Sequence, residues 1–300
     1  MRSGETARIA AVVHLYYPER WPELASCLKA CGRGFDLFVT YVNDDPVLDA
    51  VRTDFPDAHF IKASANRGFD IAPFLQVLDS IDVSAYDYVV KLHTKRDVVE
   101  PIPLFINGYD FDGPAWRNHL LRPFRSSESW RLVWESFERD REVKMVADAH
   151  VILKPRDTPW EVEREIMRLS KERAEKDFAF TLPRSPLFVA GTMFAARMEV
   201  FKPFLGKFRG GDFEASERDG TVQLAYQLER LFGFSACSGG GKIVSFDGSF
   251  AAVRRRAFVK RSVKAFLRFF YQDKTGRTGR RIIKVLKIPV YASRAKVVAA

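Results

Sequence analysis

The first third of the chain alternates short apolar runs with segments of helical periodicity. The apolar runs read "RIAAVVHLYY", "FDLFVTYV", "AHFIKAS" and "YDYVVKLHTK", and the segments between them read "WPELASCLKAC", "PVLDAVRTDF" and "IAPFLQVLDSI". Runs that are apolar at consecutive positions indicate strands buried on both faces. Strands that alternate with helices predict an α/β domain with a mostly parallel, doubly wound sheet. We assign residues 1–253 to this domain.

The middle of the chain is less regular. A loop rich in Pro and Gly, "PIPLFINGYDFDGPAW", precedes two expected helices, "WRNHLLRPF" and "SESWRLVWESFERD". The run "VKMVADAHVIL" predicts a further strand, and "PWEVEREIMRLSKERAEKDF" predicts a charged amphipathic helix. We expect "RSPLFVAGTMFAARMEVFKPFL" to be a strand that runs into a helix, and "TVQLAYQLERLFG" to be a helix that follows an acidic loop.

Residues 254–300 differ from the rest of the chain in charge. They contain 15 Lys or Arg and one acid, Asp273, so this tail carries +14, whereas the whole chain carries +10 and the first 253 residues carry −4. In "RRRAFVKRSVKAFLRFFYQDK", aromatic and aliphatic residues alternate with cations at helical spacing, which is typical of an interfacial helix on anionic lipid. Nucleic acid and the acidic body of the protein are alternative partners. We predict a basic helical tail that binds an anionic membrane surface and no nucleic acid.

Composition narrows the cellular setting. No stretch approaches the roughly 18 apolar residues of a membrane span, and the amino terminus does not read as a secretion signal, so we expect a cytoplasmic protein that is peripheral at the inner membrane face. Cys27, Cys31 and Cys237 form no spaced set of four ligands, and we interpret them as packing residues. Three histidines are scattered along the sequence and are interpreted as packed or surface residues, so no metal site is predicted: His59, His119 and His150.

Polar side chains follow several of the predicted strands. In doubly wound sheets, ligands bind outside the carboxyl ends of the strands, so we expect these side chains to line one crevice. The candidate binding residues at this edge are His14, Tyr16, Asn43, Asn66, Arg67, Gly68, Asp70, Lys91, His93, Lys95 and Arg96.

The turn "ANRGFDIAPF" stands between a predicted strand and a predicted helix. Gly68 permits a tight turn, Asp70 is a plausible helix N-cap, and Pro73 falls in the first helical turn, where its missing N–H costs little. This structural explanation suffices for the turn taken alone. The functional alternative is that free N–H groups at the helix start, beside Arg67, bind a phosphate or sugar diphosphate.

The strand end "KLHTKRD" concentrates positive charge. Alternation along the strand places Lys91, His93 and Lys95 on one side and Thr94 and Arg96 on the other. Such charges can be merely solvated, but at the mouth of a doubly wound sheet they favour an anion. A diphosphate fits, because cations stabilise the charge that develops on a departing nucleotide.

A third group combines "FVAGTMFAAR" with the acidic loop "GGDFEASERDG". Gly191 allows a ligand to approach the backbone closely, and Thr192 offers a hydroxyl, so both are assigned to the sugar and acceptor pocket. A carboxylate near the attacking hydroxyl can act as a general base. The loop supplies Asp212, Glu214, Glu217 and Asp219 as alternatives, and we take Asp219, with Glu217 as its substitute, as the candidate. A helix cap and a solvated loop are the structural alternatives.

The segments "VVHLYYPERWPEL", "FDLFVTYV", "NRGFDIAPFL", "YDYVVKLHTKRD", "AGTMFAAR" and "DGTVQLAYQLERLFG", in this order over roughly residues 8–235, resemble the rhamnan synthesis protein F family. Two positions differ from the pattern of that family: Phe69 replaces an arginine, and Ala195 replaces an aromatic residue. The layout is also similar to the A-type glycosyltransferase fold, in which the corresponding strand ends in a metal-holding "DxD" rather than in "LHTKR".

The resemblance implies an inverting glycosyltransferase of cell-surface polysaccharide synthesis. Its implied donor is dTDP-L-rhamnose, its implied acceptor is the hydroxyl of a lipid-linked glycan, and no metal or other cofactor is expected, because fixed cations replace the metal of the "DxD" site. The alternative from another class is a non-catalytic carbohydrate-binding or scaffold module of a polysaccharide assembly complex.

Overall fold

A seven-stranded sheet forms the centre of the protein. The computed structural model describes residues 7–63, 67–103, 110–154, 157, 161–214, 223–275, 281–285 and 288–292. The sheet order is β11-β7-β10-β4-β1-β2-β3. The strand bounds are β1 Ile9–Leu15, β2 Asp36–Tyr41, β3 His59–Lys62, β4 Tyr88–His93, β7 Val143–Ala147, β10 Phe194–Arg197 and β11 Lys242–Ser245. Strand β10 is antiparallel to both of its neighbours and the other pairings are parallel, so the predicted mostly parallel α/β sheet is confirmed.

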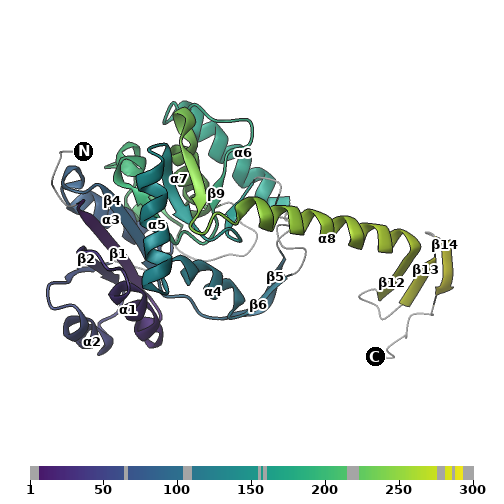
Figure 1. Ribbon diagram of the computed structural model, residues 1–300, viewed down its shortest axis with the longest axis horizontal. Helices are drawn as coiled ribbons and strands as arrows, with labels where there is room; N and C mark the ends of the chain where they lie inside the picture. The colour runs from purple at the N-terminus through teal and green to yellow at the C-terminus, as the bar shows by residue number, and fades with distance from the viewer. Residues whose placement is uncertain are drawn as a thin grey trace.

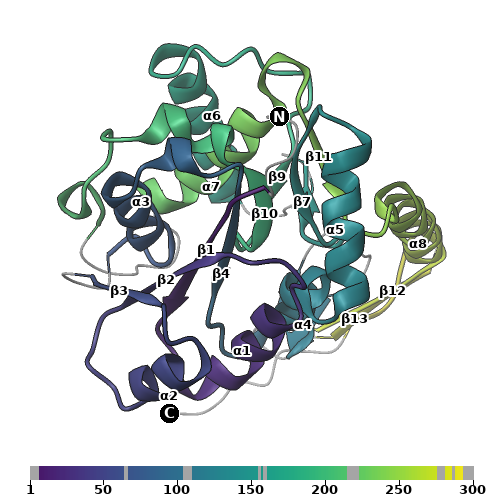
Figure 2. The ribbon, with the colours of Figure 1, turned by 60° about the vertical axis from the view of Figure 1, so that its left-hand side comes forward.

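Helices cover both faces of this sheet. Helices α3 (Ile71–Ser80) and α7 (Leu224–Cys237) pack on one face, and α1 (Trp21–Lys29) and α5 (Ser127–Arg139) lie on the other, with α2 (Val47–Asp54) beside α1 (Figure 2). The indole N–H of Trp130 in α5 donates to the Cys27 carbonyl in α1 at 2.8 Å, which joins the two helices. The three cysteines are buried and free, as expected of packing residues.

The central strands β1 and β4 run side by side and in register. Every residue of both strands is buried, which agrees with their continuous apolar runs. The register pairs His14 of β1 with His93 of β4. Because the two strands are parallel, both imidazoles lie at the same carboxyl edge of the sheet.

The region between β4 and α7 differs from the sequence prediction. The expected strand "VKMVADAHVIL" is interrupted, because the Asp148 side chain accepts the backbone N–H of His150 at 2.8 Å and turns the chain between β7 and β8. Where a loop was predicted, β5 and β6 form an antiparallel pair. The remaining bounds are β5 Val98–Pro103, β6 Asp110–Gly113, α4 Ala115–Leu121, β8 Ile152–Leu153, α6 Glu161–Lys176 and β9 Phe188–Val189.

Short 3-10 helices connect several of these elements. Residues after β10, where a helix was expected, form the 3-10 helix η4, which contains Pro203. The bounds are η1 Pro18–Arg20, η2 Val83–Ala85, η3 Arg122–Phe124, η4 Met198–Phe204, η5 Gly210–Asp212 and η6 Ser238–Gly240.

The basic tail forms a long helix that projects from the body of the protein (Figure 1). Helix α8 spans Phe250–Phe270, and an antiparallel sheet of β12 (Tyr271–Thr275), β13 (Arg281–Val285) and β14 (Ile288–Ala292) follows it. The prediction of a wholly helical tail was therefore wrong beyond residue 270, where β-branched residues in "RIIKV" and "IPVYA" favour strands. None of the helices that the structure describes has the length and apolar character that crossing a membrane requires.

Candidate functional site

Two turns that are far apart in the sequence meet at one buried lysine. The Lys91 Nζ, from β4, donates to the Asp70 carboxylate at the start of α3, and it bonds the Thr192 hydroxyl at 2.8 Å and the Thr192 carbonyl at 3.2 Å. The Thr192 hydroxyl in turn donates to the same Asp70 oxygen. Lys91 is only 1% exposed. The prediction that it presents a free cation to a diphosphate was therefore wrong, because its charge is paired inside the protein.

The charges of this cluster stabilise one another. Burial acts to raise the pKa of the Asp70 carboxyl, but the Lys91 charge and the bonds from Lys91 and Thr192 outweigh it and hold that pKa well below its usual range. Burial lowers the pKa of the Lys91 ammonium, and Asp70 opposes that effect. Asp70 stands at the N-cap position of α3 as predicted, yet its carboxylate takes no hydrogen bond from the described first turn of that helix. Its side chain joins α3 to β4 instead.

Both turns have unusual backbone conformations. Gly68 and Phe69 have φ of 66° and 55°, and Gly191 and Thr192 have φ of 75° and 49°. Positive φ is uncommon outside glycine and costly for a β-branched residue, and such strain concentrates at functional sites. A Cβ on Gly68 would stand 2.4 Å from the Phe213 ring, so glycine is required there for packing as well.

A small cavity of about 80 Å³ opens beside this cluster. It is lined by His14, Tyr16, Tyr17, Phe69, Asp70, His93, Thr94 and Lys95. The Nδ1 of His14 bonds the Thr40 hydroxyl at 2.9 Å, but its Nε2 and both ring nitrogens of His93 have no hydrogen-bond partner within the described part of the chain. Burial lowers the pKa of His14 to about 4 and that of His93 to about 3, so both rings are neutral at pH 7. The His93 Nδ1 faces the Asp70 carboxylate at 3.5 Å, so the Nε2 atoms of His14 and His93 are the buried polar atoms left for a ligand or water.

A second cavity, of about 150 Å³, adjoins the first at Tyr16. Its lining includes Asn43 and Asp45, which follow β2. The Thr94 hydroxyl accepts the backbone N–H groups of Tyr16 and Tyr17 at 2.9 and 2.8 Å and so holds the loop after β1 against the end of β4. The structure thus groups His14, Tyr16 and Asn43 along one edge, as the sequence analysis expected.

The other predicted cations lie apart from the buried lysine. Lys95 reaches the small cavity, and Arg96 is exposed on the same strand end. Arg67 lines a larger cavity, of about 400 Å³, that runs along α3 towards Asp79. We place the candidate site at the small cavity rather than here, because the unpartnered buried nitrogens lie there. Asn66 lies outside the described residues.

The proposed base and the acidic loop are only partly described. Glu217 and Asp219 lie outside the described residues. Glu214 accepts the backbone N–H of Leu224 at 3.0 Å at the start of α7, and Asp212 accepts that of Arg209 at 2.7 Å. Both of these acids therefore support local structure.

Sequence reasoning missed Glu229, which lies in α7 beside the Gly191 turn. Its Oε2 accepts the Gly191 N–H at 2.7 Å, and its Oε1 pairs with Arg230 at 2.5 Å. Burial raises the pKa of its carboxyl, although Arg230 and the Gly191 N–H oppose that effect. Nothing in the spacing of "LERLFG" distinguishes this acid from a surface residue, because only the packing of α7 brings it to the turn.

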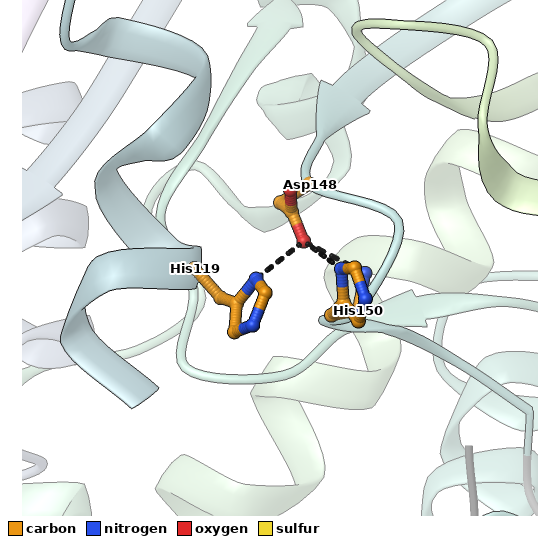
Figure 3. A group of neighbouring side chains, drawn as sticks. All are labelled: His119, Asp148 and His150. Atoms are coloured by element: carbon orange, nitrogen blue, oxygen red, sulfur yellow. Dashed lines mark hydrogen bonds and ion pairs between the residues drawn. The ribbon is translucent and has the colours of Figure 1, made fainter. Parts of the chain in front are cut away.

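The structure brings His119 and His150 together, which the sequence analysis did not anticipate. Their rings lie 4.1 Å apart between centroids, and the Nδ1 atoms of both face the Asp148 carboxylate (Figure 3). Thirty-one positions separate the two histidines along the chain, so no local motif joins them.

A family model and two relatives match this chain. The model of the family described as rhamnan synthesis protein F matches residues 1–240. The chain belongs to this family. Two relatives, both named "Uncharacterized protein WxcX", come from Xanthomonas campestris pv. campestris. The protein of strain B100 is 25% identical over 239 residues, and that of strain ATCC 33913 is 24% identical over the same length.

The match with the two relatives covers 79% of this chain and 32% of each relative, so the chain spans about a third of the length of the proteins it matches. The family takes its description from the synthesis of rhamnan.

Proposed function

We propose that this protein is an inverting glycosyltransferase that moves a sugar, rhamnose from dTDP-L-rhamnose, to the hydroxyl of a lipid-linked glycan. The observation that carries the proposal is the cavity at the carboxyl edge of β1 and β4, where His14 and His93 present unpartnered buried nitrogens beside Lys95. This is the edge at which parallel α/β sheets bind nucleotides. The family supplies the polysaccharide context.

The two adjoining cavities suggest how the donor lies. Sites for ligands of this size are usually about 300–1,000 Å³, and these two cavities, of about 80 and 150 Å³, are smaller even together, so a nucleotide sugar would occupy both and extend beyond them. We assign the diphosphate to His14, His93, Lys95 and Arg96, and the nucleoside to the cavity of Tyr16 and Asn43. A phosphate at the first position would accept hydrogen bonds from both imidazoles and draw them toward their protonated forms. The Asn66 to Gly68 turn would border the sugar.

The proposal includes transfer without an obligatory divalent metal. Asp70, the acid that lines the small cavity, is bound to Lys91 and Thr192. A carboxylate so engaged is a poor ligand for Mg²⁺, which is usually held by free carboxylates together with substrate phosphates. The cationic strand end at Lys95 and Arg96 would stabilise the departing nucleotide diphosphate in place of a metal.

The acceptor would approach the Gly191–Thr192 turn. We keep Asp219 as the proposed base, with Glu217 as its substitute, because either would stand in the loop that precedes α7. One carboxylate suffices for an inverting reaction, in which it takes the proton of the attacking hydroxyl as the C1–O bond to the diphosphate breaks. Glu229 would act as a positioning residue that holds the turn through the Gly191 N–H.

The test is a binding and transfer assay with the purified full chain. We expect dTDP-L-rhamnose to bind more tightly than UDP and GDP sugars, and His93→Ala to weaken that binding without lowering the melting temperature by more than a few degrees. Asp219→Asn or Glu217→Gln should abolish transfer to a lipid-linked acceptor while donor binding persists. The matched control is Asp212→Asn, since Asp212 serves a local backbone contact.

The second candidate function is a non-catalytic binding or scaffold module. It is favoured by the small size of the two cavities at the carboxyl edge of β1 and β4, and by the ion pair that engages Asp70 in the lining of the smaller one. Binding of the nucleotide sugar with no turnover on any lipid-linked acceptor would support it, whereas transfer sensitive to Asp219 or Glu217 would exclude it.

We further propose that α8 docks the protein on an anionic membrane at the inner face. Its exposed apolar side chains gather within one arc of the helix: Phe258, Val259, Val263 and Phe266, of which the two Phe side chains are 65% and 63% exposed. Arg255, Arg256 and Lys260 are exposed on the same helix. An apolar stripe with cations matches lipid head groups better than nucleic acid, where the aromatic rings would need to stack on bases.

A further inference from the structure

A second constellation lies on the other side of β10 from Lys91. His119 comes from α4, and Asp148 and His150 come from the turn after β7 (Figure 3). The Nδ1 atoms of His119 and His150 lie 3.2 and 2.8 Å from the same oxygen, Asp148 Oδ1, and the three ligand atoms lie within 4.8 Å of one another. Neither the proposed transfer nor the family description uses these residues.

We propose that His119, Asp148 and His150 bind one divalent transition-metal ion of the zinc class, with a water molecule at the fourth position. Two imidazole nitrogens and one carboxylate oxygen are the ligand types that zinc takes, and three protein ligands leave an open position. Ligand atoms about 2.0–2.1 Å from a tetrahedral zinc stand about 3.3 Å apart. The distances from Asp148 Oδ1 to the two Nδ1 atoms, 3.2 and 2.8 Å, are near that value, and all three atoms lie within 4.8 Å of one another.

The surroundings of the cluster suit a metal site. Arg122 donates to the other Asp148 oxygen, Oδ2, at 2.9 Å and also pairs with Asp247 at 3.0 Å, so the carboxylate is held by a second layer of contacts. The two carboxylates of Asp148 and Asp247 and the one guanidinium of Arg122 together carry a net charge of −1, which favours a bound cation. Asp148 is fully buried, while the His119 and His150 side chains are 21% and 17% exposed, so an ion can enter from solvent.

The position of the cluster gives the ion a structural consequence. The chain after His150 bonds the segment before the Gly191 turn, through the Ala190 N–H and the Val151 carbonyl at 2.9 Å. Leu120, the neighbour of His119 on α4, packs against Gly191, where an added Cβ would lie 2.8 Å from it. An ion shared by α4 and the β7 turn would therefore brace the two elements that support the Gly191–Thr192 turn.

The competing explanation is a hydrogen-bonded cluster without metal. Asp148 Oδ1 accepts the His150 backbone N–H, and two imidazoles that carry their proton on Nδ1 would donate to the same oxygen. The two explanations differ in chemistry, because zinc binding requires a lone pair on each Nδ1, so the proton of each neutral ring would have to stand on Nε2 instead.

Metal binding by the chelator-stripped full chain separates them, with no dependence on transfer activity. We expect one equivalent of Zn²⁺ by competition titration, and a loss of at least about tenfold in affinity in His119→Gln and in His150→Gln, since even outer contacts of such sites are worth about 10–100-fold. His59→Gln, at an exposed position on β3, is the matched control and should bind as the wild type does.

Cobalt provides a readout that needs no variant. Co²⁺ bound to the wild type should give the strong visible bands of a four-coordinate nitrogen and oxygen site. The proposal is overturned by a wild type that takes up no stoichiometric zinc, by a double His119→Gln, His150→Gln variant with unchanged affinity, or by cobalt bands of thiolate ligation, which would place the ion at a cysteine.

Discussion

The carboxylate of Asp70 and the ammonium of Lys91 form a buried ion pair between the start of α3 and the end of β4. The two residues are 21 positions apart, and Thr192, 101 positions beyond Lys91, completes their hydrogen bonds. This contact joins the turn that resembles a nucleotide-sugar motif to the turn assigned to the acceptor. It also means that the charge available for an anionic ligand comes from Lys95 and Arg96.

Removing one partner of this pair should destabilise the protein strongly. Lys91→Met leaves the Asp70 charge buried and unpaired, and we expect a loss of about 3–5 kcal/mol in the free energy of unfolding. The double variant Asp70→Asn, Lys91→Met should lose much less than the sum of the single changes, as measured by urea unfolding. The control is Lys62→Met: Lys62 pairs with Asp44 on the surface, where solvent screens the pair, so this substitution should change the stability far less than Lys91→Met. Additive losses at Asp70 and Lys91 would contradict a coupled pair.

Acid should destabilise the protein through His14 and His93. Their folded-state pKa values, about 4 and about 3, lie below the usual value of about 6.5, so below pH 6.5 the unfolded chain takes up protons that the folded chain does not bind. Each histidine then costs about 1.4 kcal/mol per pH unit, or roughly 4 kcal/mol for both between pH 7 and pH 5.

Urea unfolding at pH 7.5, 6 and 5 measures this dependence. His93→Gln should flatten it by about half, and His59→Gln, at an exposed position, should leave it unchanged. An equal slope in the His93→Gln variant would show that the ring is already protonated or solvated in the folded state.

Gly191 should tolerate alanine less well than other glycines with positive φ. Gly191 has φ of 75°, and a Cβ there would meet Leu120 at 2.8 Å and Trp116 at 3.0 Å. Gly206 has φ of 68° but open space around it, so it separates backbone strain from overpacking. We expect Gly206→Ala to cost about 1–2 kcal/mol, and Gly191→Ala to cost a further 1–3 kcal/mol or so. Equal thermal unfolding of the two variants would mean that α4 moves freely away from the turn.

Transfer should persist when Mg²⁺ is removed. The strand end "LHTKR" carries no carboxylate, and Asp70 is bound to Lys91. We therefore expect the transfer rate in excess chelator to stay within a few-fold of the untreated rate. If a metal stabilised the transition state, its removal would lower the rate by about 10²- to 10³-fold. Full loss restored by Mg²⁺ would contradict the prediction. Partial loss restored by Zn²⁺ alone would instead be assigned to His119 and tested with His119→Gln.

Helix α8 should bind vesicles through its apolar face. Replacing Phe258 and Phe266 with serine removes two large exposed rings, and we expect flotation with phosphatidylserine vesicles to fall by at least about tenfold, since each buried CH₂ is worth about 0.8 kcal/mol. Arg255→Ala should reduce binding at low salt more than at high salt, because basic residues act through the surface potential. Tight, salt-sensitive binding to oligonucleotides with no flotation would favour nucleic acid.

The pattern of the chain determined the sheet and the edge at which the candidate site lies. The apolar runs at 9–15 and 88–93 are buried along their whole length, and the polar residues that end them meet at one edge, because parallel strands place their carboxyl ends together. The hydrophobic pattern is a local property of the sequence, and it was enough to predict that His14, Tyr16 and His93 lie at the same edge of the sheet. The sequence analysis did not predict the strands after residue 270 or the interruption of the strand at Asp148, because short apolar runs are compatible with both helix and strand.

The chemical state of the site was decided only by tertiary structure. The sequence shows that residue 91 is a lysine, but not whether its ammonium is exposed. The packing of α3 and β10 buries it against Asp70 and Thr192. Its charge is therefore neutralised by an internal ion pair and is not available to a phosphate. Glu229 reaches Gly191, and His119 reaches His150, for the same reason. Glu229 lies 38 positions from Gly191, and His150 lies 31 positions from His119, and no spacing rule along the chain encodes contacts over such distances.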